Sequence, residues 1–280
     1  MDEAQARVKV PVVEVAVEAY RLVFGRLDLL LEFAWAPLLI LLAAAILPEL
    51  LLPAAATAAD AAFGFTVADA IEVVVALLCL NAFAVHWHQT VLYGRQRAVP
   101  PRLFRGAFIR FLVYTVLMYL AFLALLTAIL AVAFTGPAVQ PGEALSNGAL
   151  LMLLMASAAS VLLWLAAARL SLLFPAAAYG APLGLGAAWR DMRGNTWRLA
   201  ACGFISCAPF VLIVAFVLSL LLSSMQLGAP LAGPPLGLLL LRGVVDTVSN
   251  FIVVGLGATI LSGFYRRIVL AAVPATASEE

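Results

Sequence analysis

Long apolar runs separated by short polar segments dominate the pattern along this chain of 280 residues. Six runs approach or exceed the length of about 20 apolar residues that a helix needs to cross a bilayer. Ala, Leu and Val fill these runs without the alternation of barrel strands, so the sequence predicts an all-α integral membrane protein. The six spans are expected at residues 33–52, 67–93, 111–134, 148–170, 199–225 and 242–270.

Two shorter segments have an amphipathic pattern. Residues 11–32 place Val13 and Val17 at helical spacing, with charged side chains elsewhere around the turn. Between the fourth and fifth spans, Trp189 and Trp197 lie eight residues apart, close to one helical face. We expect both segments to form helices in the membrane interface. The predicted architecture is six transmembrane helices in three hairpins, with interfacial amphipathic helices on the cytoplasmic side.

The domain organisation expected from this pattern is simple. Residues 11–270 form one six-span membrane domain, and residues 1–10 and 271–280 form disordered termini. The first apolar run begins only at Phe33, after a lead-in that mixes acids and bases, so we interpret it as a retained span rather than a secretory signal.

Composition excludes a water-soluble domain. Charged residues make up 11% of the chain, against roughly 25% in soluble proteins, and nothing indicates a nucleic-acid partner. The basic residues are Lys9 and fifteen arginines. Arginine binds phosphate and carboxylate groups bidentately, although a coding bias toward Arg and Ala would produce the same excess. The three cysteines lie in apolar runs, so no disulfide framework is expected.

The basic residues gather on one side of the predicted membrane. They lie in the N-terminal segment, in the loops between spans 2 and 3 and between spans 4 and 5, and at the end of span 6, whereas the opposite loops contain no Lys or Arg. By the positive-inside rule, the basic side is cytoplasmic and both termini are inside.

A family resemblance rests on the segment between the fourth and fifth spans. Its distinctive residues are Arg169, Ser171, Pro175, Ala188-Trp189 and Gly194-Asn195-Thr196-Trp197-Arg198. This combination resembles bacterial six-span inner-membrane proteins related to the membrane domain of glycerophosphoryl diester phosphodiesterases and to the YciC-like group. The resemblance covers about 60 residues well and the rest in layout only. It implies a multi-pass protein of the bacterial inner (plasma) membrane, but no reaction, because no phosphodiesterase domain is attached.

Arg169 is the most informative single residue. A charge at the bilayer centre costs about 2.5–3.5 kcal/mol and usually marks a function. Arg169 is near the end of the fourth span, so two interpretations stay open: an anchor that snorkels to the cytoplasmic interface, or a buried Arg that binds a lipid phosphate or pairs internally. The candidate lipid or anion contacts are Arg169, Trp189, Arg190, Trp197 and Arg198.

A second polar group lies toward the outer side. Arg242, Asp246 and Asn250 form one stripe on span 6, and Asp69 and Glu72 at the outer end of span 2 are placed to face it. These five residues form a candidate intramembrane polar network. It is either a salt bridge for helix packing near the interface or a polar entrance for a cation or proton.

Catalytic and metal-binding patterns are not found in the sequence. His86 and His88 are two residues apart, hence on different helical faces, and zinc normally takes three or four ligands. We expect interfacial positions for both histidines and an interhelical hydrogen bond for Asn81. No GxSxG elbow and no phosphate-binding Gly-Lys-Ser/Thr motif is present. No enzyme activity, metal or cofactor is therefore predicted.

Two function classes follow from these patterns. Runs of small residues and the lack of chemistry favour a membrane-complex partner, assembly or structural protein. The alternative is a carrier or binder of anionic lipid or a small amphiphile. The expected partners are the lipid bilayer, with anionic phospholipid at the cytoplasmic leaflet, and other membrane proteins.

Overall fold

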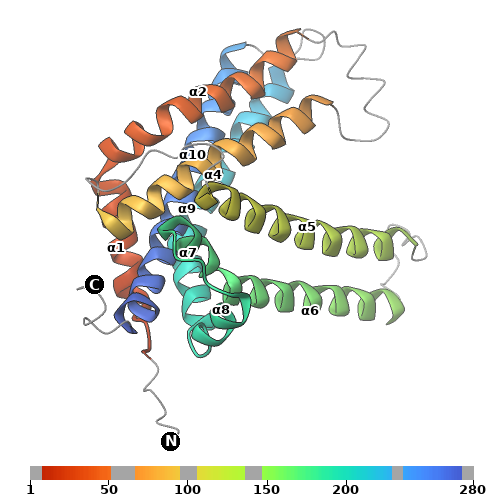
Figure 1. Ribbon diagram of the computed structural model, residues 1–280. Helices are drawn as coiled ribbons and strands as arrows, with labels where there is room; N and C mark the ends of the chain where they lie inside the picture. The colour runs from red at the N-terminus through yellow and green to blue at the C-terminus, as the bar shows by residue number, and fades with distance from the viewer. Residues whose placement is uncertain (1–7, 52–66, 95–105, 136–146, 229–235, 273–280) are drawn as a thin grey trace, which may run out of the picture.

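A computed structural model describes residues 8–51, 67–94, 106–135, 147–228 and 236–272. Every regular element in these ranges is a helix (Figure 1). In chain order the helices are α1 (Val12–Gly25), α2 (Leu27–Leu51), α4 (Val67–Tyr93), α5 (Gly106–Thr135), α6 (Asn147–Leu170), α7 (Leu173–Tyr179), α8 (Leu185–Asp191), α9 (Thr196–Gly228), α10 (Leu236–Ile268) and the short 3-10 helix η3 (Leu270–Ala272).

Six helices, α2, α4, α5, α6, α9 and α10, are long and apolar enough to cross a membrane. The predicted all-α fold with six spans is confirmed. Helices suit this environment because a bilayer core offers backbone N–H and C=O groups no other partners. The same constraint explains why α2 continues through Pro37 and α9 continues through Pro209, where a soluble helix would tend to break.

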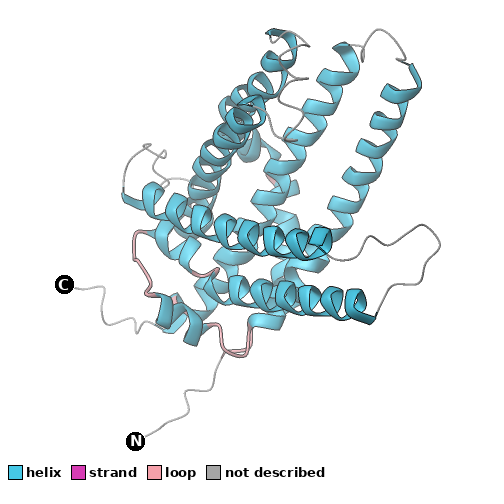
Figure 2. Cartoon of the chain, turned by 90° about the vertical axis from the view of Figure 1, so that its right-hand side faces the viewer, coloured by secondary structure: helices cyan, strands magenta, loops and turns pink. Residues whose placement is uncertain are grey.

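The long helices form three hairpins, α2 with α4, α5 with α6, and α9 with α10. Figures 1 and 2 show α5 and α6 side by side, extending away from the other four long helices. The hairpins meet where α4, α6 and α10 end and α5 and α9 begin. We call this the basic end, because these helix ends carry arginines there: Arg110, Arg169, Arg198, Arg266 and Arg267.

Polar side chains join the long helices inside the bundle. The Trp87 indole donates to Thr259 Oγ1 at 2.8 Å, and His88 Nδ1 lies 2.7 Å from Ser262 Oγ. His88 is only 1% exposed, so its imidazole lies inside the bundle. The interhelical bond predicted for Asn81 is confirmed, because Thr115 donates to its Oδ1 at 2.6 Å.

One face of helix α1 is buried in the bundle, and the opposite face is exposed. Val15, Ala19 and Val23 are buried against the neighbouring helices α9 and α10, whereas Val13 and Val17 of the predicted apolar stripe are exposed. The Tyr20 hydroxyl donates to the Ser206 carbonyl at 2.6 Å, and burial raises the pKa of this phenol above its ordinary value, with Cys207 adding to the shift.

The segment after Arg169 packs against the long helices instead of extending away from them. It turns at Ser171 and forms α7, whose Ala176, Ala177 and Ala178 are buried against the neighbouring α4, α5 and α10. Small alanines allow this close approach. The short helix ends at Gly180, whose φ of 80° favours glycine.

Several predictions concern residues outside the described ranges. They include most of both termini predicted to be disordered, and four arginines of the loop between the second and third spans, Arg95, Arg97, Arg102 and Arg105.

Candidate functional site

The candidate site begins with Arg169, the penultimate residue of α6. Its Nε donates to Thr196 Oγ1 at 3.3 Å, and its Cζ lies 4.6 Å from the centre of the Trp189 ring. Cation–π contact of this kind holds a guanidinium without neutralising it. No carboxylate among the described residues forms an ion pair with Arg169, so its positive charge is available to a ligand.

The segment that follows places two tryptophans on different helices. α8 ends at Asp191, residues 192–195 form a turn, and α9 begins at Thr196. Gly194 has a φ of 90°, a conformation that favours glycine. The prediction of a single interfacial helix that carries Trp189 and Trp197 on one face is therefore wrong, because the turn at Gly194 interrupts it.

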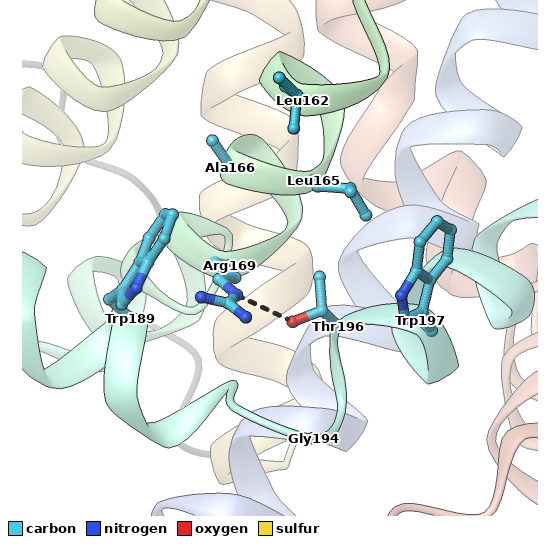
Figure 3. A pocket seen from close by; sticks show the side chains of 8 residues that line it. All are labelled: Leu162, Leu165, Ala166, Arg169, Trp189, Gly194, Thr196 and Trp197. Atoms are coloured by element: carbon cyan, nitrogen blue, oxygen red, sulfur yellow. Dashed lines mark hydrogen bonds between the residues drawn. The ribbon is translucent and has the colours of Figure 1, made fainter. Parts of the chain in front are cut away.

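A pocket of about 310 Å³ lies between the end of α6, α8 and the start of α9. Figure 3 shows the Arg169 guanidinium between Trp189 and Trp197, directed toward Thr196. The side chains on α6 form its apolar wall. The residues that line the pocket are Leu162, Leu165, Ala166, Arg169, Trp189, Gly194, Thr196 and Trp197.

Burial differs from one wall of the pocket to the other. Thr196 is 6% exposed, whereas Trp197 is 66% exposed and Trp189 lies between these extremes. Such exposed indoles are typical of the membrane–water interface, where the ring is apolar and the N–H reaches water or headgroups. The pocket wall is thus buried at Thr196, beside the turn, and exposed at Trp197.

The other two predicted lipid contacts do not line this pocket. Arg190 is exposed on α8. Arg198 donates through Nη1 to the Val10 carbonyl at 3.0 Å, so its side chain is directed at the N-terminal segment. The structure therefore brings Arg169, Trp189 and Trp197 together and separates them from Arg190 and Arg198.

The predicted polar network lies far from this site along the spans. Arg242, Asp246 and Asn250 are exposed on α10, where Asn250 Nδ2 is 3.5 Å from Asp246 Oδ2. Asp69 is half-buried and Glu72 exposed near the start of α4. Within the described part of the chain, Arg242 has no ion-pair partner.

Two parts of the site were not among the predicted lipid contacts. Thr196 accepts from Arg169, and the α6 positions Leu162, Leu165 and Ala166 supply the apolar wall. The Gly-Asn dipeptide at 194–195 is a turn signal, and it would have separated Trp189 from Trp197. The positions of the α6 residues follow only from how the helices pack.

No group of three or more possible metal ligands is found among the described residues. No protein family, curated protein or solved structure matches this chain.

Proposed function

We propose that this multi-pass membrane protein binds an anionic phospholipid at the pocket around Arg169. In this proposal the protein lies in a bacterial inner membrane with both termini cytoplasmic, the pocket faces the cytoplasmic leaflet, and no reaction is catalysed. The observation that carries the proposal is an arginine held by Trp189 and Thr196, with no acidic partner in the described chain, on the wall of a pocket.

The donors around the pocket match a phosphate group. Arginine carries five N–H donors in a planar fork, and Arg169 uses Nε for Thr196, which leaves both Nη groups for bidentate contact with phosphate oxygens. α9 begins at the same place, and the first N–H groups of a helix lack intrahelical partners. The positive end of the helix dipole also favours an anion.

The apolar wall distinguishes a lipid from free phosphate. Leu162, Leu165 and Ala166 lie on α6 on the bilayer side of Arg169. An amphiphile with a phosphate head and hydrocarbon chains would contact both the donors and this wall. The pocket volume of about 310 Å³ is at the small end of the roughly 300–1,000 Å³ of ligand sites. It is suited to a headgroup, with the chains in the bilayer.

The headgroup that fits best is anionic rather than zwitterionic. Choline groups are usually held by aromatic cages, but the face of Trp189 nearest the pocket is covered by the Arg169 guanidinium. A choline group at this ring would be repelled by the positive charge of Arg169. We therefore expect phosphatidylglycerol to bind more tightly than phosphatidylcholine.

A role as a membrane-complex partner, which the sequence favoured, would use the exposed apolar faces of α5 and α9. Lipid chains cover such faces equally well. The pocket is the more specific feature, so lipid binding is the function that we propose.

The test is a titration of the detergent-solubilised protein with phosphatidylglycerol and phosphatidylcholine, followed by native mass spectrometry. Arg169→Ala should lower the affinity for phosphatidylglycerol relative to phosphatidylcholine by about tenfold, since a hydrogen bond to a charged group contributes about 1.5–3 kcal/mol. The matched control is Arg190→Ala, which removes the same charge from the exposed face of α8. Equal losses in both variants would contradict a site at Arg169.

Inorganic phosphate serves as the competitor in the same experiment. Little displacement of phosphatidylglycerol by a large excess of phosphate supports a lipid site. Complete displacement at concentrations equal to those of the lipid would instead indicate a soluble phosphorylated ligand.

The proposed orientation has its own test. Reporter fusions in the 136–147 segment and at the C-terminus should report opposite sides of the membrane. The same side for both would refute the orientation.

A further inference from the structure

The N-terminal segment is bound to the turn that forms the pocket. The Val10 amide donates to Asn195 Oδ1 at 3.1 Å, and Asn195 Nδ2 donates to the Val8 carbonyl at 2.9 Å. Arg198 adds the bond to the Val10 carbonyl at 3.0 Å. The backbone of residues 8–10 is therefore held on both sides of Lys9 by the side chains of Asn195 and Arg198.

Asn195 lies between residues that line the pocket. Gly194 precedes it, and Thr196 and Trp197 follow it. Asn195 is 3% exposed and Val10 is fully buried, so the contact is part of the packed interior rather than a surface bond. Because a buried amide must keep its hydrogen bonds, the position of residues 8–10 helps to fix the backbone on both sides of Asn195.

The contact also changes how α9 begins. The Asn195 carbonyl accepts from the Leu199 amide at 2.9 Å, as the carbonyl of a helix N-cap residue does. An Asn in this position normally uses its side-chain oxygen to accept from the first turn of its own helix. Asn195 Oδ1 accepts from Val10 instead. The first turn of α9, which adjoins Arg169, is thereby left to an external acceptor such as phosphate.

We propose that residues 8–10 act as a latch on the lipid pocket and that Asn195 is the positioning residue through which they act. This inference rests on the proposed function. When the latch is docked, Asn195 is turned away from α9, and Thr196 and Trp197 are held where they line the pocket. Anything that draws the N-terminal segment away from Asn195 then weakens phospholipid binding.

Thermodynamic linkage makes the effect reciprocal. If the docked latch strengthens lipid binding, bound lipid must strengthen docking of the latch by the same factor. Hydrogen exchange of the Val10 amide reports docking directly, because its acceptor is Asn195 Oδ1. Added phosphatidylglycerol should slow this exchange, and phosphatidylcholine at the same concentration should not.

The experiment is a double-mutant cycle in the full chain, with the ratio of phosphatidylglycerol to phosphatidylcholine affinity as the readout. Asn195→Ala removes the side chain from one side of the contact, and Val10→Pro removes the N–H from the other. Each should lower the ratio by roughly fivefold, which is the low end of typical coupling between sites. The double variant should lose no more than either single one. Val13→Ala is the control, because Val13 is an exposed residue of α1 outside this contact.

The outcomes separate this inference from the proposed function. If Arg169→Ala lowers the ratio but Asn195→Ala does not, while exchange at Val10 becomes faster, the latch is refuted and the lipid site stands. Losses that add in the double variant also refute it, because the two residues then act independently. If Arg169→Ala leaves the ratio unchanged, the lipid site and the latch are both overturned.

Discussion

Two arginines at the basic end of this protein have opposite surroundings. Arg267, near the end of α10, donates through Nη2 to Glu14 at 2.7 Å and to Glu18 at 2.8 Å, and its side chain is 18% exposed. Arg169 has no acidic partner among the described residues and is held by the Trp189 ring and the Thr196 hydroxyl. The charge of Arg267 is paired with carboxylates inside the protein, whereas the charge of Arg169 is available to pair with an anionic ligand.

The difference shows how an arginine near the membrane interface can be interpreted. Position along a span does not separate the two residues, because both lie close to the basic end of a long helix. Their partners separate them. A carboxylate partner offsets the charge and ties α1 to α10, while an aromatic ring and a hydroxyl orient a guanidinium and leave it positive.

The largest effect is expected from Arg267→Ala. Hydrogen bonds to charged groups contribute about 1.5–3 kcal/mol, but Glu14 and Glu18 are 60% and 40% exposed, which lowers the value. We expect the free energy of unfolding to fall by about 1–2 kcal/mol in a detergent unfolding titration, with the lipid affinity ratio unchanged. Arg266→Ala, which removes a more exposed and longer contact of 3.5 Å with Glu18, should cost clearly less. A loss of lipid selectivity in Arg267→Ala would contradict the claim that only Arg169 of these two arginines binds lipid.

The second prediction gives Arg169 the kind of partner that Arg267 has. Thr196→Asp places a carboxylate beside Arg169 Nε, now 3.3 Å from the threonine hydroxyl, at the first position of α9 where an acid is favourable. The affinity ratio should fall by about tenfold, or about 1.4 kcal/mol, although the arginine is intact. Stability should stay the same or rise by a few tenths of a kcal/mol. Thr196→Ser keeps the hydroxyl and should bind as the original does. Unchanged binding in the aspartate variant would mean that the ligand does not use the Arg169 charge.

The sequence alone predicted the membrane class and the six spans, because apolar length is a local property that the bilayer imposes on each helix separately. For the same reason α4 begins and ends where the pattern indicated, at Val67 and Tyr93. Helix ends that fall in polar segments were harder to predict from the sequence, because the apolar pattern does not mark them. The pattern joined residues 11–32 into one helix, whereas the chain breaks at Arg26, whose φ of −133° and ψ of 50° are not helical.

The candidate site was predicted in part. Arg169, Trp189 and Trp197 were identified because charged and aromatic residues at the end of a span are unusual enough to notice. Arg198 was grouped with them on the same grounds, but its bond to Val10 joins residues 188 positions apart. Such a contact depends on how the bundle closes, and no pattern of spacing contains it. The same applies to Asn195, whose partners are equally remote in the chain.

A smaller effect is expected from the ring that orients Arg169. Trp189→Leu removes the cation–π contact, which contributes about 0.5–1 kcal/mol at exposed sites, so the affinity ratio should fall by about threefold. Trp189→Phe keeps an aromatic face and should lose less. Trp164→Leu, on the preceding turns of α6 and outside the pocket lining, is the control for loss of a membrane tryptophan. Equal effects of Trp189→Leu and Trp164→Leu would indicate general anchoring rather than orientation of Arg169.

The smallest effects are expected at the opposite end of the spans. Arg242, Asp246 and Asn250 are exposed on α10, and the contact recorded between Asn250 and Asp246 is a long one of 3.5 Å. From Arg266, Asp246 is 20 residues back along α10, about 30 Å at 1.5 Å per residue, which places it near the far edge of a hydrocarbon core of about 30 Å. Substitutions at exposed positions usually change stability by no more than about 0.5 kcal/mol.

Arg242→Ala and Asp246→Ala should therefore alter neither the unfolding titration nor the ratio of lipid affinities measured for the Arg169 pocket. An arginine in an apolar span is then a binding residue only where neighbouring side chains orient it toward a pocket, as Trp189 and Thr196 do for Arg169. A change of threefold or more in the lipid ratio in either variant would contradict this. It would show that phospholipid contacts both ends of the spans, as a carrier that moves lipid between leaflets requires.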